Sequence, residues 1–157
     1  MRSSYKLKHQ ASIKVIDLDI NKVIDHESAI ARMGGEDLYK FLLPQFESSS
    51  LMPYLENIAK EFNMKEWDKV KFYVHTMKTP AGCIGASRLH YACYFIQKAF
   101  HEGDIESMIE YYPFLIETAI EVRIHLRPLV AKYSGRCKCL SHINSVHLFS
   151  CLKTLIL

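Results

Sequence analysis

A histidine with two lysines at helical spacing is the arrangement in this sequence with the clearest chemistry. Lys71 precedes His75 by four residues and Lys78 follows it by three, and residues three or four apart are neighbours on a helix surface. Imidazole is nucleophilic near neutral pH, and an ammonium group stabilises added negative charge. The arrangement predicts a phosphoryl acceptor, and the alternative is an ordinary surface histidine among the eight in the chain.

The apolar residues around His75 predict the side of the helix on which it lies. They recur at the helical period and form one stripe: Trp67, Val70, Val74 and Met77. Such a stripe faces the core. His75 falls roughly 120° from the centre of the stripe, which places the imidazole on the solvent side.

Two other groups of residues suggest chemistry less directly. A C-terminal group has zinc-type ligands, and its members are Cys137, Cys139, His142, His147 and Cys151. Their spacing fits no common closed site, so we expect no metal and interpret this tail as unstructured or loosely packed. An aromatic group at helical spacing is typical of a helical core rather than a ligand pocket, and it comprises Tyr91, Tyr94, Phe95, Tyr111, Tyr112 and Phe114.

Composition restricts the class of protein. Hydrophobic residues make up 49% of the 157, enough for one domain with a core, and the net charge of +3 with scattered basic residues argues against a nucleic-acid binder. Five cysteines without a disulfide framework predict free thiols. No secretory signal is apparent, and residues 146–157 are too few for a bilayer span of about 20 residues. We expect a cytoplasmic protein, with nuclear entry left open.

The apolar spacing predicts an all-α fold. A short helix should run from Asn21 or Asp25 to Met33, where two glycines stop it. The next helical segment, residues 36–62, should be interrupted between Pro44 and Pro53, with a serine as the cap of the second part.

The remaining helices are also defined by prolines and glycines. A helix over residues 65–79 should end or bend at Pro80. Another should begin at Ile84 or Ser87 and end at Phe100. The last should cover residues 105–133, with kinks at Pro113 and Pro128, before Gly135.

Four long helices with short loops predict an antiparallel up-down four-helix bundle with a short extra N-terminal helix. The corresponding division of the chain is a 1–18 arm, which contains a short strand or loop at 13–18, a 19–135 bundle, and a 136–157 tail without a predicted structure.

The motif around His75 has a known counterpart. Residues 75–86 read HTMKTPAGCIGA and resemble the phosphorylation motif of the histidine-containing phosphotransfer (HPt) family, commonly His-x-Leu-Lys-Gly-Ser-Ala followed by a segment like Ile-Gly-Ala. Further matching positions are residues 31–39, Glu66-Trp67, Leu89, Ala92, Cys93 and Glu102-Gly103-Asp104. The resemblance covers residues 19–133.

This resemblance implies roles for three residues. His75 would be the phosphoacceptor through its Nε2 atom, and Lys78 would help to hold the phosphoryl oxygens. Gln97 lies where several family members carry a glutamine that orients the acceptor imidazole, although an ordinary exposed polar residue is an equal alternative. The chain departs from the family at Thr79-Pro80, where a glycine normally leaves room for the partner.

The resemblance also implies the partners. A response-regulator receiver domain would supply the aspartate and the Mg²⁺, and a hybrid sensor kinase would act upstream, because this chain shows no ATP site. We expect the chain to have no cofactor of its own and to be a monomer. Candidate docking contacts are Phe72, Met77 or Met33, Leu38 and Ile84, although each of these apolar residues alone is more typical of the core than of an interface. Candidate steering charges are Lys71, Lys78 and Arg88.

Three hypotheses remain open at this point. The first is a phosphorelay intermediate that acts as a carrier rather than as an autonomous enzyme. The second is a docking adaptor of the same fold that is not phosphorylated, and Thr79-Pro80 favours it. The third is a helical protein that binds metal through its C-terminal cysteines.

Overall fold

The protein is described by a computed structural model that covers residues 22–134. These residues form helices joined by short turns, and no β-strand occurs among them, so the predicted all-α class is confirmed here. The predicted N-terminal arm and the tail with its cysteines and histidines lie outside the described residues. The helices are α2 (His26–Met33), α3 (Glu36–Gln45), the π-helix η1 (Phe46–Leu51), α4 (Met52–Asn63), α5 (Trp67–Cys83), α6 (Ser87–His101) and α7 (Ile105–Ser134).

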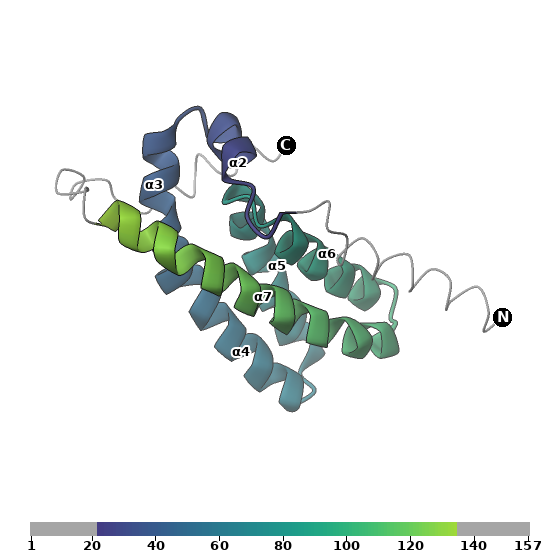
Figure 1. Ribbon diagram of the computed structural model, residues 1–157. Coiled ribbons are helices and arrows are strands. Elements are labelled where there is room, and N and C mark those ends of the chain that lie inside the picture. The colour runs from purple at the N-terminus through teal and green to yellow at the C-terminus, as the bar shows by residue number, and fades with distance from the viewer. Residues whose placement is uncertain (1–21, 135–157) are drawn as a thin grey trace.

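Helix α7 runs the length of the described structure, and α5 and α6 lie behind it in Figure 1. Neighbouring helices in the chain pack side by side, α4 on α5, α5 on α6 and α6 on α7, while α3 and η1 also contact α7. Within residues 22–134, no helix combines the length and apolar character needed to cross a bilayer.

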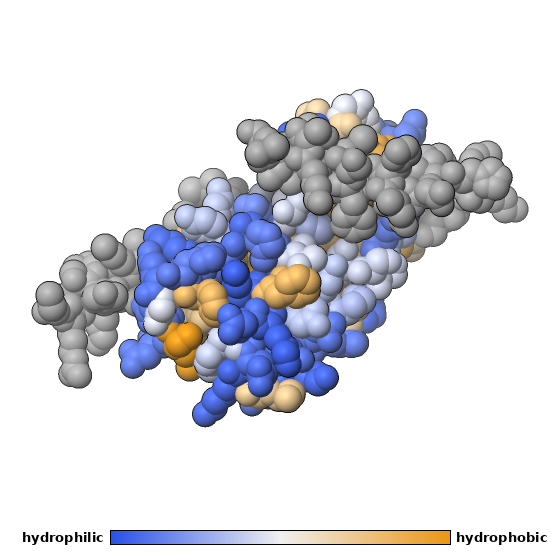
Figure 2. Space-filling view, turned by 180° about the vertical axis from the view of Figure 1, so that it is seen from behind, coloured by the Kyte–Doolittle hydropathy of each residue, from blue (hydrophilic) through white to orange (hydrophobic). Residues whose placement is uncertain are grey.

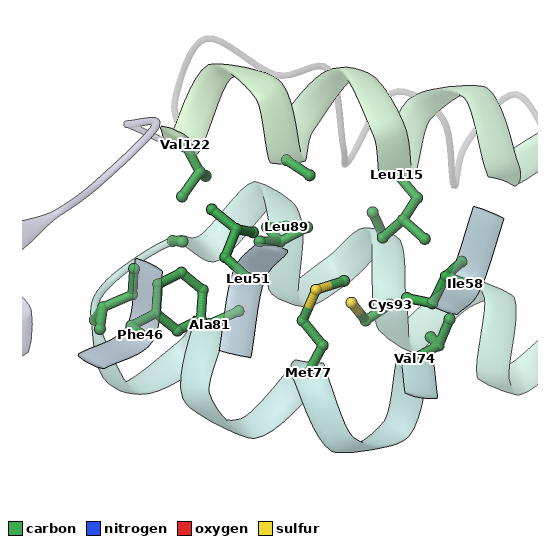
Figure 3. Packing of buried hydrophobic residues seen from close by; sticks show 14 of the residues in the cluster. Phe46, Leu51, Ile58, Val74, Met77, Ala81, Leu89, Cys93, Leu115 and Val122 are labelled. Carbon is green, nitrogen blue, oxygen red and sulfur yellow. The ribbon is translucent and has the colours of Figure 1, made fainter. Parts of the chain in front are cut away.

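One hydrophobic core joins these helices. Figure 3 shows side chains of α5 and α7 that point toward one another, with Leu51 and Leu89 between them. The predicted stripe of α5 faces this core, because Val70, Val74 and Met77 are all buried. The stripe therefore fixes which side of α5 remains for solvent.

Local signals define both ends of α2. The Asp25 carboxylate accepts a hydrogen bond from the Ser28 backbone N–H at 3.2 Å, as an N-cap does. At the other end, Gly34 adopts the left-handed conformation with φ +76° and closes the helix. The predicted helix to Met33 is confirmed, with its start at the second of the two expected positions.

We expect acid to weaken this cap through Asp25. Hydrogen bonds from the backbone N–H and the hydroxyl of Ser28 hold the pKa of Asp25 below its ordinary value. Because the folded-state pKa is depressed, the stabilisation is present above the unfolded-state pKa and is lost as pH falls through the folded one. Asp25→Asn keeps an acceptor that does not titrate, so its helicity should change less between about pH 4 and 2 in circular dichroism. Superimposable acid profiles would contradict this role.

The interruption between α3 and α4 is a widened turn rather than a break. Helix α3 contains Pro44, which removes one backbone donor, and the π-helix η1 follows it directly. The predicted serine cap is wrong, because no side chain caps α4. Instead, the Ser48 hydroxyl donates to the Pro44 carbonyl at 2.9 Å within the continuous helical segment. Pro53 does lie in the first turn of α4, as predicted.

The prolines of α5 and α7 do not end their helices. Helix α5 continues through Pro80 to Cys83, so the predicted end at Thr79 is wrong. Helix α7 likewise passes through Pro113 and Pro128. Each proline removes one amide donor, but burial along these helices compensates, as the fully buried Ala81 shows just beyond Pro80.

Helices α2 and α3 are fastened to the turn that joins α5 to α6. Three hydrogen bonds make the link: Asp25 N–H to the Gly85 carbonyl (2.9 Å), Arg32 to the Gly82 carbonyl (3.2 Å) and the Tyr39 hydroxyl to the Ile84 carbonyl (3.1 Å). Burial raises the pKa of Tyr39, which keeps its hydroxyl protonated as a donor. Residues 82–85, which follow His75 at the end of α5, are therefore held in place by α3 and by both ends of α2.

Candidate functional site

His75 lies on the solvent side of α5, where the sequence predicts it. Its side chain is exposed, and the residue before it, Val74, is fully buried. Among residues 22–134, no hydrogen bond or ion pair engages the imidazole. The imidazole is therefore exposed and unengaged in this part of the chain, as an attack by Nε2 on an external group requires.

Lys78 follows His75 by one helical turn and is held by α6. Its ammonium Nζ donates to the Gln97 Oε1 atom at 2.8 Å and lies 6.0 Å from the centre of the Tyr94 ring. The hydrogen bond is partly buried. A neutral amide orients the ammonium without cancelling its charge, so Lys78 keeps its attraction for an anion.

The other cations of α5 and α6 have different partners. Lys69 and Lys98 contact carboxylates, and the Arg88 guanidinium lies 2.7 Å from the Glu121 carboxylate. Among residues 22–134, neither Lys71 nor Lys78 has a carboxylate within ion-pair distance. Lys71 and Lys78, each about one helical turn from His75 along α5, therefore keep their charge uncompensated by a carboxylate in this part of the chain, whereas the predicted steering charge of Arg88 is largely neutralised.

Gln97 contacts Lys78 rather than the imidazole. Its Oε1 atom accepts from the ammonium, and no hydrogen bond joins Gln97 to His75 within the described part of the chain. The amide Nε2 donors stay available on the same side chain. Orientation of the His75 ring by Gln97 stays a prediction, and the observed role of Gln97 is to hold Lys78.

The predicted docking contacts divide into exposed and buried residues. Phe72 is 61% exposed one turn before His75, and Leu38 is 39% exposed on α3. Met77 and Ile84 are buried in the core, so a partner cannot reach them and their prediction as docking contacts is wrong. Met33 is half-buried.

Figure 2 shows the side of the molecule opposite α7, where apolar side chains form small separate patches within a hydrophilic surface. A surface of this kind suits a brief encounter with a partner rather than a permanent interface.

His90 has no role predicted from the sequence, although the structure places it beside Lys78. The His90 Nδ1 atom lies 3.0 Å from the Lys78 carbonyl oxygen. A carbonyl only accepts, so Nδ1 carries the hydrogen. A β-carbon on Gly82 would lie 3.0 Å from the same nitrogen. The only sequence signal for this contact is the helical spacing of His90 and Gln97 on α6, seven residues apart.

The cysteines of the described residues are not suited to nucleophilic chemistry. Burial raises the thiol pKa of both Cys83 and Cys93, and nearby Arg32 only partly opposes this at Cys83. Residues 22–134 also contain no cluster of three or more His, Cys, Asp or Glu side chains that could hold a metal ion. His75 with Lys78 is therefore the best-defined candidate site in this part of the chain.

Comparison of the chain with models of protein families, with curated proteins and with solved structures finds no match.

Proposed function

We propose that this chain is a histidine phosphotransfer protein, an intermediate in a multistep phosphorelay. His75 accepts a phosphoryl group from the aspartate of a receiver domain, such as that of a hybrid sensor kinase, and passes it to a response regulator. Lys78 stabilises the phosphoryl oxygens. The chain acts as a phosphocarrier without an ATP site, and Mg²⁺ belongs to the receiver.

The observation that carries this proposal is an exposed, unengaged imidazole on α5, with a lysine one helical turn later whose ammonium is held by a neutral amide. The 2.8 Å bond between Lys78 and Gln97 limits where the ammonium can lie. Phosphoryl transfer depends mainly on positioning and electrostatic stabilisation. A scaffold that presents His75 on a packed helix, with Lys78 already oriented, supplies both.

In the transfer step the His75 Nε2 lone pair attacks phosphorus in line with the bond to the receiver's aspartate. The nitrogen–phosphorus bond forms, the phosphorus–oxygen bond breaks, and its electron pair returns to the aspartate as a carboxylate. The imidazole ring keeps the hydrogen on Nδ1. Transfer to a response regulator is the same step in reverse, with that regulator's aspartate as the nucleophile.

The proposal includes a finer description of the fold and setting. Residues 19–135 would form an antiparallel up-down four-helix bundle of the HPt type, with α2 as the extra N-terminal helix. The side-by-side packing of α4, α5, α6 and α7 supports this arrangement, and the stacking of Phe62 on Tyr112 at 3.7 Å brings α4 to α7. We propose a cytoplasmic monomer.

The direct test is to mix the purified chain with acetyl-phosphate-charged receiver domains and Mg²⁺. We expect base-stable, acid-labile label on the chain. Absence of label with a panel of receivers that still bind would support the alternative function, a docking adaptor that is not phosphorylated. The observation that favours this alternative is Thr79, whose side chain lies one turn after His75 where the family has glycine.

We expect Thr79→Gly to raise the rate of phosphoryl transfer about threefold, because it removes atoms beside the acceptor and relieves about 0.7 kcal/mol of steric cost. Glycine within α5 should lower the free energy of unfolding by only about 0.3 kcal/mol, because threonine is itself a poor helix former. Stopped-flow transfer assays and urea unfolding measure the two effects. The transfer rate of Thr79→Ala, which keeps a β-carbon, should lie between those of wild type and Thr79→Gly. An unchanged or slower rate in Thr79→Gly would show that Thr79 does not narrow the approach.

A further inference from the structure

Three side chains of α6 contact Lys78, one at its backbone and two at its ammonium group. His90, Tyr94 and Gln97 are spaced by four and three residues, which places them on one face of α6. His90 bonds the Lys78 carbonyl (3.0 Å), the Tyr94 ring lies under the ammonium (6.0 Å), and Gln97 accepts from Nζ (2.8 Å). Lys78 is thus attached to α6 at both ends.

The backbone contact lies where α5 most needs support. Pro80 has no N–H, so the Thr76 carbonyl receives no amide bond from the residue four positions later. A proline at this place also pushes the preceding turn open. Lys78 lies within that weakened turn, and its carbonyl is the one that the His90 side chain holds.

The approach of His90 depends on a glycine. A β-carbon at position 82 would lie 3.0 Å from His90 Nδ1 and 3.5 Å from the neighbouring ring carbon. The first of these distances is tighter than most β-carbon contacts in proteins, so a side chain at Gly82 requires the imidazole to shift by a few tenths of an ångström. The glycine at position 82 therefore leaves room for the His90 imidazole in the turn that follows Pro80.

We propose that His90 is a positioning residue for Lys78, and that Gly82 makes its contact possible. This inference rests on the proposed function, in which Lys78 stabilises the transferred phosphoryl group. His90 donates its Nδ1 hydrogen to the Lys78 carbonyl and fixes the turn that Pro80 weakens. The Lys78 side chain then starts from a fixed backbone position, and its ammonium reaches Gln97.

The test measures the position of the Lys78 side chain and the rate of phosphoryl transfer separately, both in the full chain. In His90→Ala and in Gly82→Ala, we expect the side-chain amide signals of Gln97 in NMR spectra to move as its bond to Lys78 is disturbed. The rate of phosphoryl transfer should fall on the order of tenfold. The double variant should be little worse than either single one, because both changes remove the same contact.

Two controls separate positioning from general damage. His90→Asn places an amide donor near the position of Nδ1 and should restore the Gln97 signals and the rate to within about twofold. His125→Ala removes a similar bond on α7, in which the His125 Nδ1 atom lies 2.8 Å from the Glu121 carbonyl oxygen. This variant should change neither the Gln97 signals nor the transfer rate. Unmoved Gln97 signals in His90→Ala would overturn the inference. If wild type takes up no phosphoryl group, the proposed function fails, and the Gln97 signals still decide whether His90 positions Lys78.

Discussion

We expect His75→Gln to abolish the uptake of label from a phosphorylated receiver domain and to leave the fold unchanged. Glutamine keeps a polar side chain of similar reach but has no nucleophilic nitrogen. Because His75 is exposed and lies outside the core, its replacement should change the free energy of unfolding by less than about 0.5 kcal/mol. Labelling with radioactive phosphate and thermal unfolding measure the two quantities on the same preparation.

A matched control for this variant is His101→Gln. His101 is also exposed and is the last residue of α6. Its replacement should leave labelling at the wild-type level. Full labelling of His75→Gln would show that another side chain accepts the phosphoryl group, and equal losses in both variants would show that the effect is not specific to position 75.

Gly85→Ala should be the most damaging small substitution in the described residues. Gly85 has φ +83°, a conformation that costs an L-residue about 1–2 kcal/mol. An added β-carbon would also lie 2.3 Å from the carbonyl oxygen of Asp25, which accepts the first hydrogen bond of α2. We expect the free energy of unfolding to fall by about 3 kcal/mol and Tm by roughly 10 °C. Urea and thermal unfolding check both values.

Gly103→Ala provides the control for backbone strain alone. Gly103 has a similar φ of +71°, but a β-carbon there would have no atom within 4 Å. We expect Gly103→Ala to lower the free energy of unfolding by about 1 kcal/mol. If the two variants lose the same free energy of unfolding, the contact between the new β-carbon and the Asp25 carbonyl oxygen adds nothing to the cost of Gly85→Ala.

Most of the helical structure is predictable from local signals in the sequence. The cap at Asp25, the glycine stop at Gly34 and the turn at Gly103-Asp104 all act within a few residues of the chain. The course of α5 past Pro80 is not predictable in this way. Whether a proline ends or only perturbs a helix depends on packing beyond it, here the burial of Ala81.

The candidate site was predictable in part. Periodicity places His75 on the solvent side of α5, because the direction of a side chain on a helix depends on local spacing alone. The contacts of Lys78 with Gln97 and His90 join residues on two helices, and their detection requires the relative rotation and height of α5 and α6. The same dependence explains why the sequence alone does not decide whether Ile84 is a docking contact or a core residue, and the structure places it in the core.

Phosphorus NMR of the nitrogen-labelled chain, mixed with a charged receiver domain and Mg²⁺, tests the central proposal most directly. We expect one phosphohistidine resonance, coupled to the Nε2 nitrogen of His75. A phosphorus atom bonded to any other side chain, or a receiver that keeps its phosphoryl group while bound to the chain, would contradict it.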